Sequence, residues 1–328
     1  MKTETATKNS DSASLMQSQG PLVAFLVLCA VGTVFFPTFL TPLNLTNILR
    51  QVSLTGIVSI GMAFVILSGG IDLSVGSIAA VAAVLAAKLS GDFPVTAVLI
   101  PILAGIGLGA VNGLLITRVK LPPFIATLAM MLGAGGLAFV LSGGGSAASD
   151  TSGWFSQNIA KGDVLGIPCI GFVFILALGV AIVVAKQTSF GRSVYAIGGN
   201  EEAARMMGLH VNRGKMLVYM ISGGCAATAG VLYASRYSSV PPGDFAGWEL
   251  KAIAAVVISG TSLTGGIGKM GHVLYGVLIL GTIPNIINKQ GTLGSMDTNV
   301  ITGILLLAVI LLQSRTANQE EHSVGGGA

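Results

Sequence analysis

Residues 95–117 read VTAVLIPILAGIGLGAVNGLLIT and contain no charged side chain. A bilayer core of roughly 30 Å requires about 20 consecutive apolar residues as a helix, so this run is long enough to cross one. A surface helix of a soluble protein would need a continuous polar face, which Thr96, Asn112 and Thr117 alone do not supply. The run therefore predicts a membrane-spanning helix.

Similar apolar runs recur on both sides of this one and together predict an all-α integral membrane protein with about ten transmembrane helices. They lie at Leu22–Leu40, 52–69, 74–91, 121–141, 169–185, 216–235, 250–263, 271–288 and 299–313. The run at 250–263 is short, which is compatible with a broken or re-entrant segment. The transmembrane domain thus covers 21–313, between a polar, poorly ordered tail at 1–20 and a second tail at 314–328.

The composition agrees with a bundle of helices in lipid. Hydrophobic residues make up 52% of the chain and charged residues 9%, whereas soluble chains carry roughly 25% charged residues. The 46 glycines fit close helix packing, because small residues let backbones approach in lipid. We expect such packing in the run Ala104–Ala110 and at Gly133, Gly135 and Gly136. The basic residues lie in loops and tails, without the clustered face that nucleic-acid binding needs.

Charges near the span ends predict the orientation, since cytoplasmic loops carry an excess of lysine and arginine. The segment 186–215 holds Lys186, Arg192, Arg205, Arg213 and Lys215, whereas 142–168 holds only Lys161. We therefore expect the first segment, a coupling loop, in the cytoplasm and the second one outside. With ten spans, both termini then lie in the cytoplasm.

A polar break separates two apolar runs at Ser68–Ser77. Asp72 can cap the helix that follows, because its carboxylate can accept hydrogen bonds from the amides near Ser74. An acid at such a break is also a functional candidate by default, and the two interpretations are compatible. The predicted residues of a translocation pathway or gate are Ser68, Asp72, Ser74, Asn112 and Asn285.

A loose internal repeat links the two halves of the chain. Residues 65–70 (VILSGG) recur as 256–261 (VVISGT), and residues 109–113 (GAVNG) are echoed by 281–285 (GTIPN). Transporters are often built from repeats. The gaps between the paired motifs differ, so duplication and coincidence both stay open.

A short helix with its own start and stop signals lies in the basic loop. Asn200 is a good N-cap, two acids follow at the positive end of the helix dipole, and Gly208 is a good C-cap. A solvated loop helix would have similar ends, but alanine and methionine give this one a small apolar face, which favours docking into a groove on a cytoplasmic partner. The predicted coupling helix comprises Asn200, Glu201, Glu202, Ala203, Ala204, Arg205, Met206, Met207 and Gly208.

The run Gly266–Gly271 has the spacing G-x-G-x-x-G but does not open a helix after a Rossmann strand. It is not a P-loop either, since Leu263 stands at the first glycine and Met270 at the serine or threonine. The sequence shows no nucleophile–base pair, carboxylate dyad or metal-ligand spacing, so we expect no catalytic residue and no metal site. If ATP drives transport, a separate chain must hydrolyse it.

Three of these segments together carry a family resemblance. The runs Gly70–Ser77, Gly191–Gly208 and Trp248–Gly266 closely resemble the ribose-type permeases of bacterial ABC importers, and the resemblance covers about 21–313. The second run includes the order E-A-A-x-x-x-G from Glu202, which looks like the motif by which such permeases dock on their ATPase.

The resemblance implies a type II ABC importer permease with ten helices per subunit, acting as a homodimer in the bacterial inner membrane. Its partners would be a periplasmic sugar-binding protein and a cytoplasmic ATPase. ATP and Mg²⁺ would bind that ATPase, and this chain would hold no cofactor. The cargo would be a monosaccharide, such as a ribose-like pentose or a hexose, or a related compound, moved from periplasm to cytoplasm.

Two other classes of membrane protein stay open. An ion-coupled secondary sugar transporter would need intramembrane acids or bases to carry protons or sodium, and Asp72 and Lys88 are almost the only candidates. A channel or structural membrane protein would have no use for a docking helix. The dependence of uptake on ATP separates the three classes.

Overall fold

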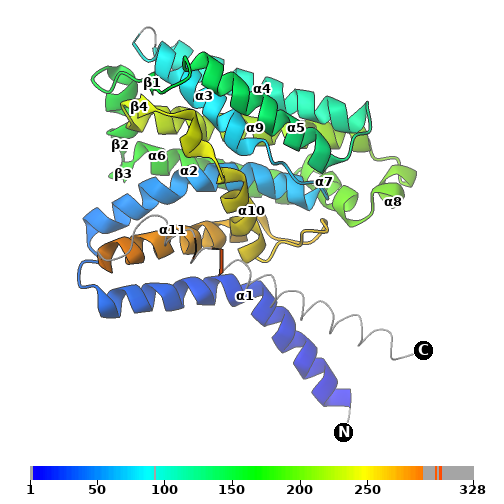
Figure 1. Cartoon of the computed structure of the whole chain (residues 1–328). Coiled ribbons are helices and arrows are strands. Elements are labelled where there is room, and N and C mark those ends of the chain that lie inside the picture. Colours follow the sequence, from blue (N-terminus) through cyan, green and yellow to red (C-terminus); the bar gives the residue numbers. More distant parts are fainter. Residues whose placement is uncertain (1–2, 92–93, 291–299, 301–302, 305–328) are drawn as a thin grey trace.

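The computed structural model describes residues 3–91, 94–290, 300 and 303–304, and shows a bundle of helices (Figure 1). Within these residues, six helices are long and apolar enough to cross a membrane. They are α2 (Pro42–Leu67), α4 (Pro94–Thr117), α5 (Pro123–Leu141), α6 (Cys169–Gln187), α9 (Val211–Arg236) and α11 (Val273–Gln290). Apart from 300 and 303–304, the predicted span at 299–313 and the tail at 314–328 lie outside the described residues.

The first helix, α1 (Thr3–Phe35), is longer than the sequence predicted. It includes residues from Thr3 onward of the segment 1–20, for which the sequence predicted a polar tail. The polar segment before Gly20 contains neither proline nor glycine, and nothing in it stops a helix from extending. Pro21 lies inside α1 and removes one backbone hydrogen bond, in agreement with the bend in α1 (Figure 1).

Two apolar helices are too short to cross a bilayer alone. The 15 residues of α3 (Val75–Leu89) and the 11 of α10 (Trp248–Ile258) span about 22 Å and 16 Å at 1.5 Å per residue. A Cβ atom on Gly76 would lie 2.6 Å from the Phe245 carbonyl oxygen, so the start of α3 meets η2 (Pro242–Phe245) directly before α10. The expected full span at 74–91 is therefore a shorter helix, and 250–263 is a broken segment.

Helix α9 lies at the centre of the bundle and packs against α2, α3 and α4. The approach is close: a Cβ atom on Gly61 of α2 would lie 2.9 Å from the Ser222 Cα, and one on Gly109 of α4 would lie 3.1 Å from the Met220 Cα. This confirms small-residue packing for the run containing Gly109. Within the described residues the glycines of α5 show no such approach: a Cβ atom on Gly133 or Gly136 would meet no atom within 4 Å, and one on Gly135 would lie 3.9 Å from the Ser77 Cβ.

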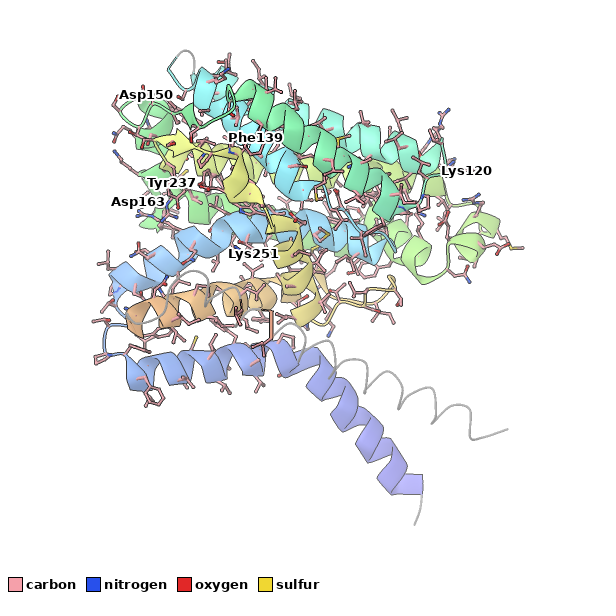
Figure 2. All side chains as sticks on the ribbon, viewed as in Figure 1. Lys120, Phe139, Asp150, Asp163, Tyr237 and Lys251 are labelled. Carbon is pink, nitrogen blue, oxygen red and sulfur yellow. The ribbon has the colours of Figure 1, made fainter. Side chains whose placement is uncertain are left out.

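The two loops that the charges assigned to different sides lie at opposite ends of the bundle. At one end β1 (Ala147–Ala148) pairs with β4 (Ser239–Val240), and β2 (Asp163–Val164) with β3 (Ile167–Pro168), near the π-helix η1 (Ser156–Ala160). At the other end lie α7 (Ser189–Gly199) and α8 (Glu201–Met206); η3 (Met270–His272) directly precedes α11. Figure 2 shows Asp150, Asp163 and Tyr237 at the first end and Lys120 near the second.

Candidate functional site

Asp72 lies at the break between α2 and α3, and its carboxylate is fully buried. Oδ1 accepts hydrogen bonds from the backbone amide of Ser74 at 3.0 Å and from its hydroxyl at 2.6 Å. Oδ2 accepts a hydrogen bond from the Ser222 hydroxyl of α9 at 2.7 Å. The predicted hydrogen bond from the Ser74 amide is therefore present, but it closes the turn before α3, whose N-cap is Ser74 without a side-chain bond. Asp72 also ties this break to the central helix.

Two more polar residues belong to this buried cluster. The amide nitrogen of Asn112, on α4, donates to the Ser74 hydroxyl at 2.8 Å, so the structure brings Asp72, Ser74 and Asn112 together as the sequence suggested. The phenol of Tyr219, on α9, is buried near Asp72. The side-chain oxygens of Asn112 and Tyr219 have no hydrogen-bond partner among the described residues. Helices α2, α3, α4 and α9 thus meet at one polar point inside an apolar bundle.

The other two predicted pathway residues lie apart from this cluster. The Ser68 hydroxyl donates to the Val65 carbonyl of its own helix at 2.8 Å. The side-chain amides of Asn285, on α11, and Asn44, on α2, exchange hydrogen bonds at 3.1 and 3.0 Å. Asn285 therefore joins the two helices α2 and α11 at a second polar contact.

The loosely repeated motif at 65–70 and 256–261 has the same local structure in both copies. Each copy ends a helix with a serine, Ser68 or Ser259, whose hydroxyl donates to the carbonyl three residues earlier. Each is followed by a glycine with positive φ, 79° at Gly69 and 86° at Gly260. The two sequences therefore end α2 and α10 in the same way.

The predicted coupling helix is present as α8 with both expected ends. The Asn200 side chain accepts a hydrogen bond from the Ala203 amide at 2.9 Å. At the other end Gly208 has φ of 82°, its amide donates to the Arg205 carbonyl, and the Leu209 amide donates to the Ala204 carbonyl. This pair of bonds is a Schellman motif, so the sequence predicted both caps correctly.

The two faces of α8 differ in burial. Ala204 is fully buried and packs with Ile197 and Val211, whereas Met206 and Met207 are 84% and 71% exposed. The predicted apolar face thus splits: an alanine holds α8 against the bundle, and two methionines project from it.

Glu201 fixes the position of α8 by ion pairs. It contacts Arg205 at 2.9 Å and Lys215 of α9 at 2.5 Å. The hydrogen bond from Lys215, more than the charge of Arg205, holds the pKa of the Glu201 carboxyl below its usual range. Glu202, the next residue along the chain, is exposed.

The glycine-rich run after α10 lies between the cluster around Asp72 and the helix α8. The Gly266 amide donates to the Leu67 carbonyl at 3.0 Å, and a Cβ atom on Gly198 would lie 2.9 Å from the Leu67 carbonyl carbon. A Cβ atom on Gly265 would lie 2.8 Å from the Gly69 Cα. The end of α7, which leads into α8, therefore touches the end of α2, which leads to Asp72, and the glycines permit this close approach.

Several partners in these sites could not be read from the sequence. Ser222 is 150 residues away from Asp72, and it stands in a run of small residues typical of helix packing alone. Nothing in the sequence marked Tyr219 or Asn44 as part of a site, beyond the fact that each is a polar residue in an apolar run. Lys215 was recognised as a basic loop residue, and its distance of 14 residues from Glu201 hid the ion pair.

Comparison with known proteins now identifies the family. Residues 44–312 match the family described as branched-chain amino acid transport system / permease component. The chain belongs to this permease family. It is 42% identical over 320 residues to the ribose import permease protein RbsC of Bacillus subtilis (strain 168), a match that covers 96% of this chain and 99% of that protein.

Two further relatives support this assignment. RbsC of Escherichia coli (strain K12) is 38% identical over 304 residues, covering 90% of this chain and 94% of the relative. The L-arabinose transport system permease protein AraH of the same strain is 37% identical over 304 residues, covering 89% of each chain. No solved structure matches the chain. The permease is thus a transport subunit and a multi-pass membrane protein, as the resemblance and the apolar helices indicated.

Proposed function

We propose that this permease is the membrane-spanning subunit of an ABC importer that moves a monosaccharide from periplasm to cytoplasm. Relatives named for ribose and arabinose import support a pentose as the first cargo to test. A periplasmic binding protein would deliver the sugar, and two copies of the permease would form the pathway. ATP and Mg²⁺ would bind a separate ATPase subunit, because the glycine-rich run that begins at Gly265 lacks the P-loop pattern and packs against Leu67 and Gly69.

The observation that carries this proposal is the exposed methionine pair on a well-capped helix. Met206 and Met207 project from α8, which is held by its caps and by Ala204. Methionine is polarizable and adaptable, and it is common at protein-binding surfaces. A helix held rigidly with its apolar side chains in water fits a docking element for the ATPase.

The contact between α7 and α2 supplies a route from this helix to the membrane. Movement of α8 would reach Gly198, then Leu67 at the end of α2, and then the break at Asp72. The cluster around Asp72 joins four helices, so we infer that it acts as the gate element. In this conformation Asp72, Ser74 and Asn112 are fully buried, as expected for a closed gate.

The test replaces Met206 and Met207 by serine and measures ATP-driven ribose and arabinose uptake in vesicles. We expect normal permease abundance, weaker co-purification of the ATPase and loss of uptake. Leu165→Ser, at a 93% exposed leucine at the opposite end of the bundle, is the matched control. Uptake driven by an ion gradient without ATP would overturn the proposal in favour of a secondary transporter.

The proposed topology has ten spans, with α8 and both termini in the cytoplasm of an inner-membrane protein. It is tested after the native cysteines are replaced by alanine. Lys161→Cys should react with an impermeant thiol reagent on cells with a permeabilised outer membrane, whereas Arg213→Cys should react only after lysis. Labelling at 213 but not at 161 in unlysed cells would reverse the orientation.

A further inference from the structure

A groove lies between the end of α4 and the junction of α8 and α9, and the established family does not explain it. It has a volume of about 860 Å³ and is open to the surface. Pockets for small molecules measure roughly 300–1,000 Å³, so the groove is large enough to hold a ligand headgroup. Its lining includes Leu114, Arg118, Arg205, His210, Arg213 and Leu217.

The polar part of the groove is basic. Arg118, Arg205, Arg213 and His210 line it, and none of the described lining residues carries a carboxylate. Arg205 already pairs with Glu201. Arg118 and Arg213, in contrast, form no ion pair with any carboxylate in the described part of the chain. Two unneutralised guanidinium groups on neighbouring helix ends favour an anionic ligand, because arginine presents a planar fork to phosphate.

The apolar part of the groove lies one helical turn further into the spans. Leu114 precedes Arg118 by four residues on α4, and Leu217 follows Arg213 by four residues on α9. The two helices run antiparallel here, since a Cβ atom on Gly109 would lie 3.1 Å from the Met220 Cα and one on Gly113 would lie 3.1 Å from the Met216 Cα. Leu114 and Leu217 are 44% and 47% exposed. The groove therefore has charge at the span ends and exposed hydrocarbon at the membrane side.

We propose that this groove binds an anionic phospholipid, with the phosphate at Arg118 and Arg213 and the acyl chains along Leu114 and Leu217. The order of charge and hydrocarbon matches a lipid at a membrane surface, where basic pockets between helices recognise headgroups. A soluble protein partner could offer carboxylates to the arginines but would not fill the lipid side at Leu114 and Leu217. The assignment to the cytoplasmic leaflet rests on the orientation in the proposed function, whereas the binding itself does not.

Such a lipid would also touch the coupling helix. Arg205 belongs to α8 and lines the same groove, so a bound headgroup would add a contact that fixes the orientation of α8. The lipid would then act as a structural ligand of the docking element, and ATPase coupling would depend on the anionic lipid content of the membrane.

The test titrates phosphatidylglycerol into purified, delipidated permease and counts bound lipid by native mass spectrometry. The double variant Arg118→Gln/Arg213→Gln should bind roughly 25-fold more weakly, equivalent to about 1 kcal/mol for each basic residue near a membrane surface. Arg192→Gln is the matched control, because Arg192 is exposed on α7 but does not line the groove, and it should leave binding unchanged.

Further binding measurements identify which molecule occupies the groove. Phosphatidylcholine should bind weakly to the unaltered permease, and free glycerol phosphate should not compete, since it lacks acyl chains. Equal phosphatidylglycerol binding by the double variant and the control would overturn the proposal. Unchanged lipid binding with loss of ATPase co-purification would assign the groove to the ATPase. Because lipid binding is measured without ATP, partner or vesicle, its failure is distinct from failure of the uptake and topology experiments.

Discussion

Asp72 and Glu201 are both carboxylates held by several donors, yet their surroundings are opposite. Asp72 is fully buried, and its partners in the described part of the chain are hydroxyls and one backbone amide. Glu201 lies at the surface with its side chain 42% exposed and pairs with two cations. Buried polar groups are costly to leave unpaired, whereas surface ion pairs contribute roughly 0.2–1 kcal/mol. The bundle should therefore depend on Asp72 for its fold and use the region of Glu201 for assembly.

Asp72→Leu should have the largest effect. It leaves the Ser74 amide, the Ser74 hydroxyl and the Ser222 hydroxyl without their acceptor, at about 1–3 kcal/mol for each buried donor. We expect a sharp fall in permease abundance and thermal stability, measured by fluorescence-detected size-exclusion chromatography after heating.

Asp72→Asn removes the negative charge at this position but keeps a side-chain oxygen that can accept hydrogen bonds. Asparagine also caps helices well and keeps one acceptor oxygen, so this variant should fold while ATP-driven uptake falls. Normal uptake by the asparagine variant would mean that the carboxylate serves only to close the turn before α3 and to join the helices.

Gly198→Ala should have the next largest effect, because it changes the contact between the end of α7 and the end of α2. The new methyl group would lie 2.6 Å from the Gly266 amide nitrogen and 2.9 Å from the Leu67 carbonyl carbon. Overpacking of this kind typically costs about 1–3 kcal/mol. We expect the permease to insert and bind the ATPase, while ATP hydrolysis no longer drives uptake.

The neighbouring glycine supplies the control for this prediction. A Cβ atom on Gly199 would have open space around it, so Gly199→Ala should transport normally. Equal uptake by the two alanine variants would show that the backbone contact at Leu67 has no part in coupling.

Gly208→Val should have a smaller effect, confined to α8. A non-glycine residue at a φ of 82° costs about 1–2 kcal/mol, and a β-branched residue is the least suited to it. The Schellman motif should open, and co-purification of the ATPase should fall at unchanged permease abundance. Gly208→Asn should keep most of the binding, because asparagine tolerates this conformation. Loss of binding by the asparagine variant alone would contradict the cap as the cause.

The contrast between the buried cluster at Asp72 and the surface helix α8 also explains how much of each site the sequence could predict. Both ends of α8 were predicted because a cap depends on residues within one turn, as Asn200 and Gly208 show. The partners of Asp72 on α4 and α9 could not be predicted as a set, because they depend on how distant helices pack. Asn112 was chosen from a repeat motif and Ser222 was missed, although both end at the same cluster.

The span pattern shows a similar limit. Apolar length predicted the long helices well, since each satisfies its own backbone hydrogen bonds in lipid. It overestimated α3, which runs only from Val75 to Leu89 of the predicted span at 74–91. Only packing against η2 and α9 reveals that α3 begins deep in the bundle.

Glu201→Gln should have the smallest effect of these changes and sharpens the comparison most. The variant loses two surface ion pairs but keeps the helix caps, so we expect a loss below about 1 kcal/mol that high salt also removes. The pKa of Glu201 is lowered from its usual 4.5 in the folded state. A group of this kind stabilises the fold above its unfolded pKa and loses that contribution as pH falls through its folded pKa. Thermal unfolding of permease and variant should therefore differ slightly at pH 7 and converge below pH 4.5. A difference that persists in acid would mean that the glutamate side chain acts through packing, and the contrast with Asp72 would then rest on burial alone.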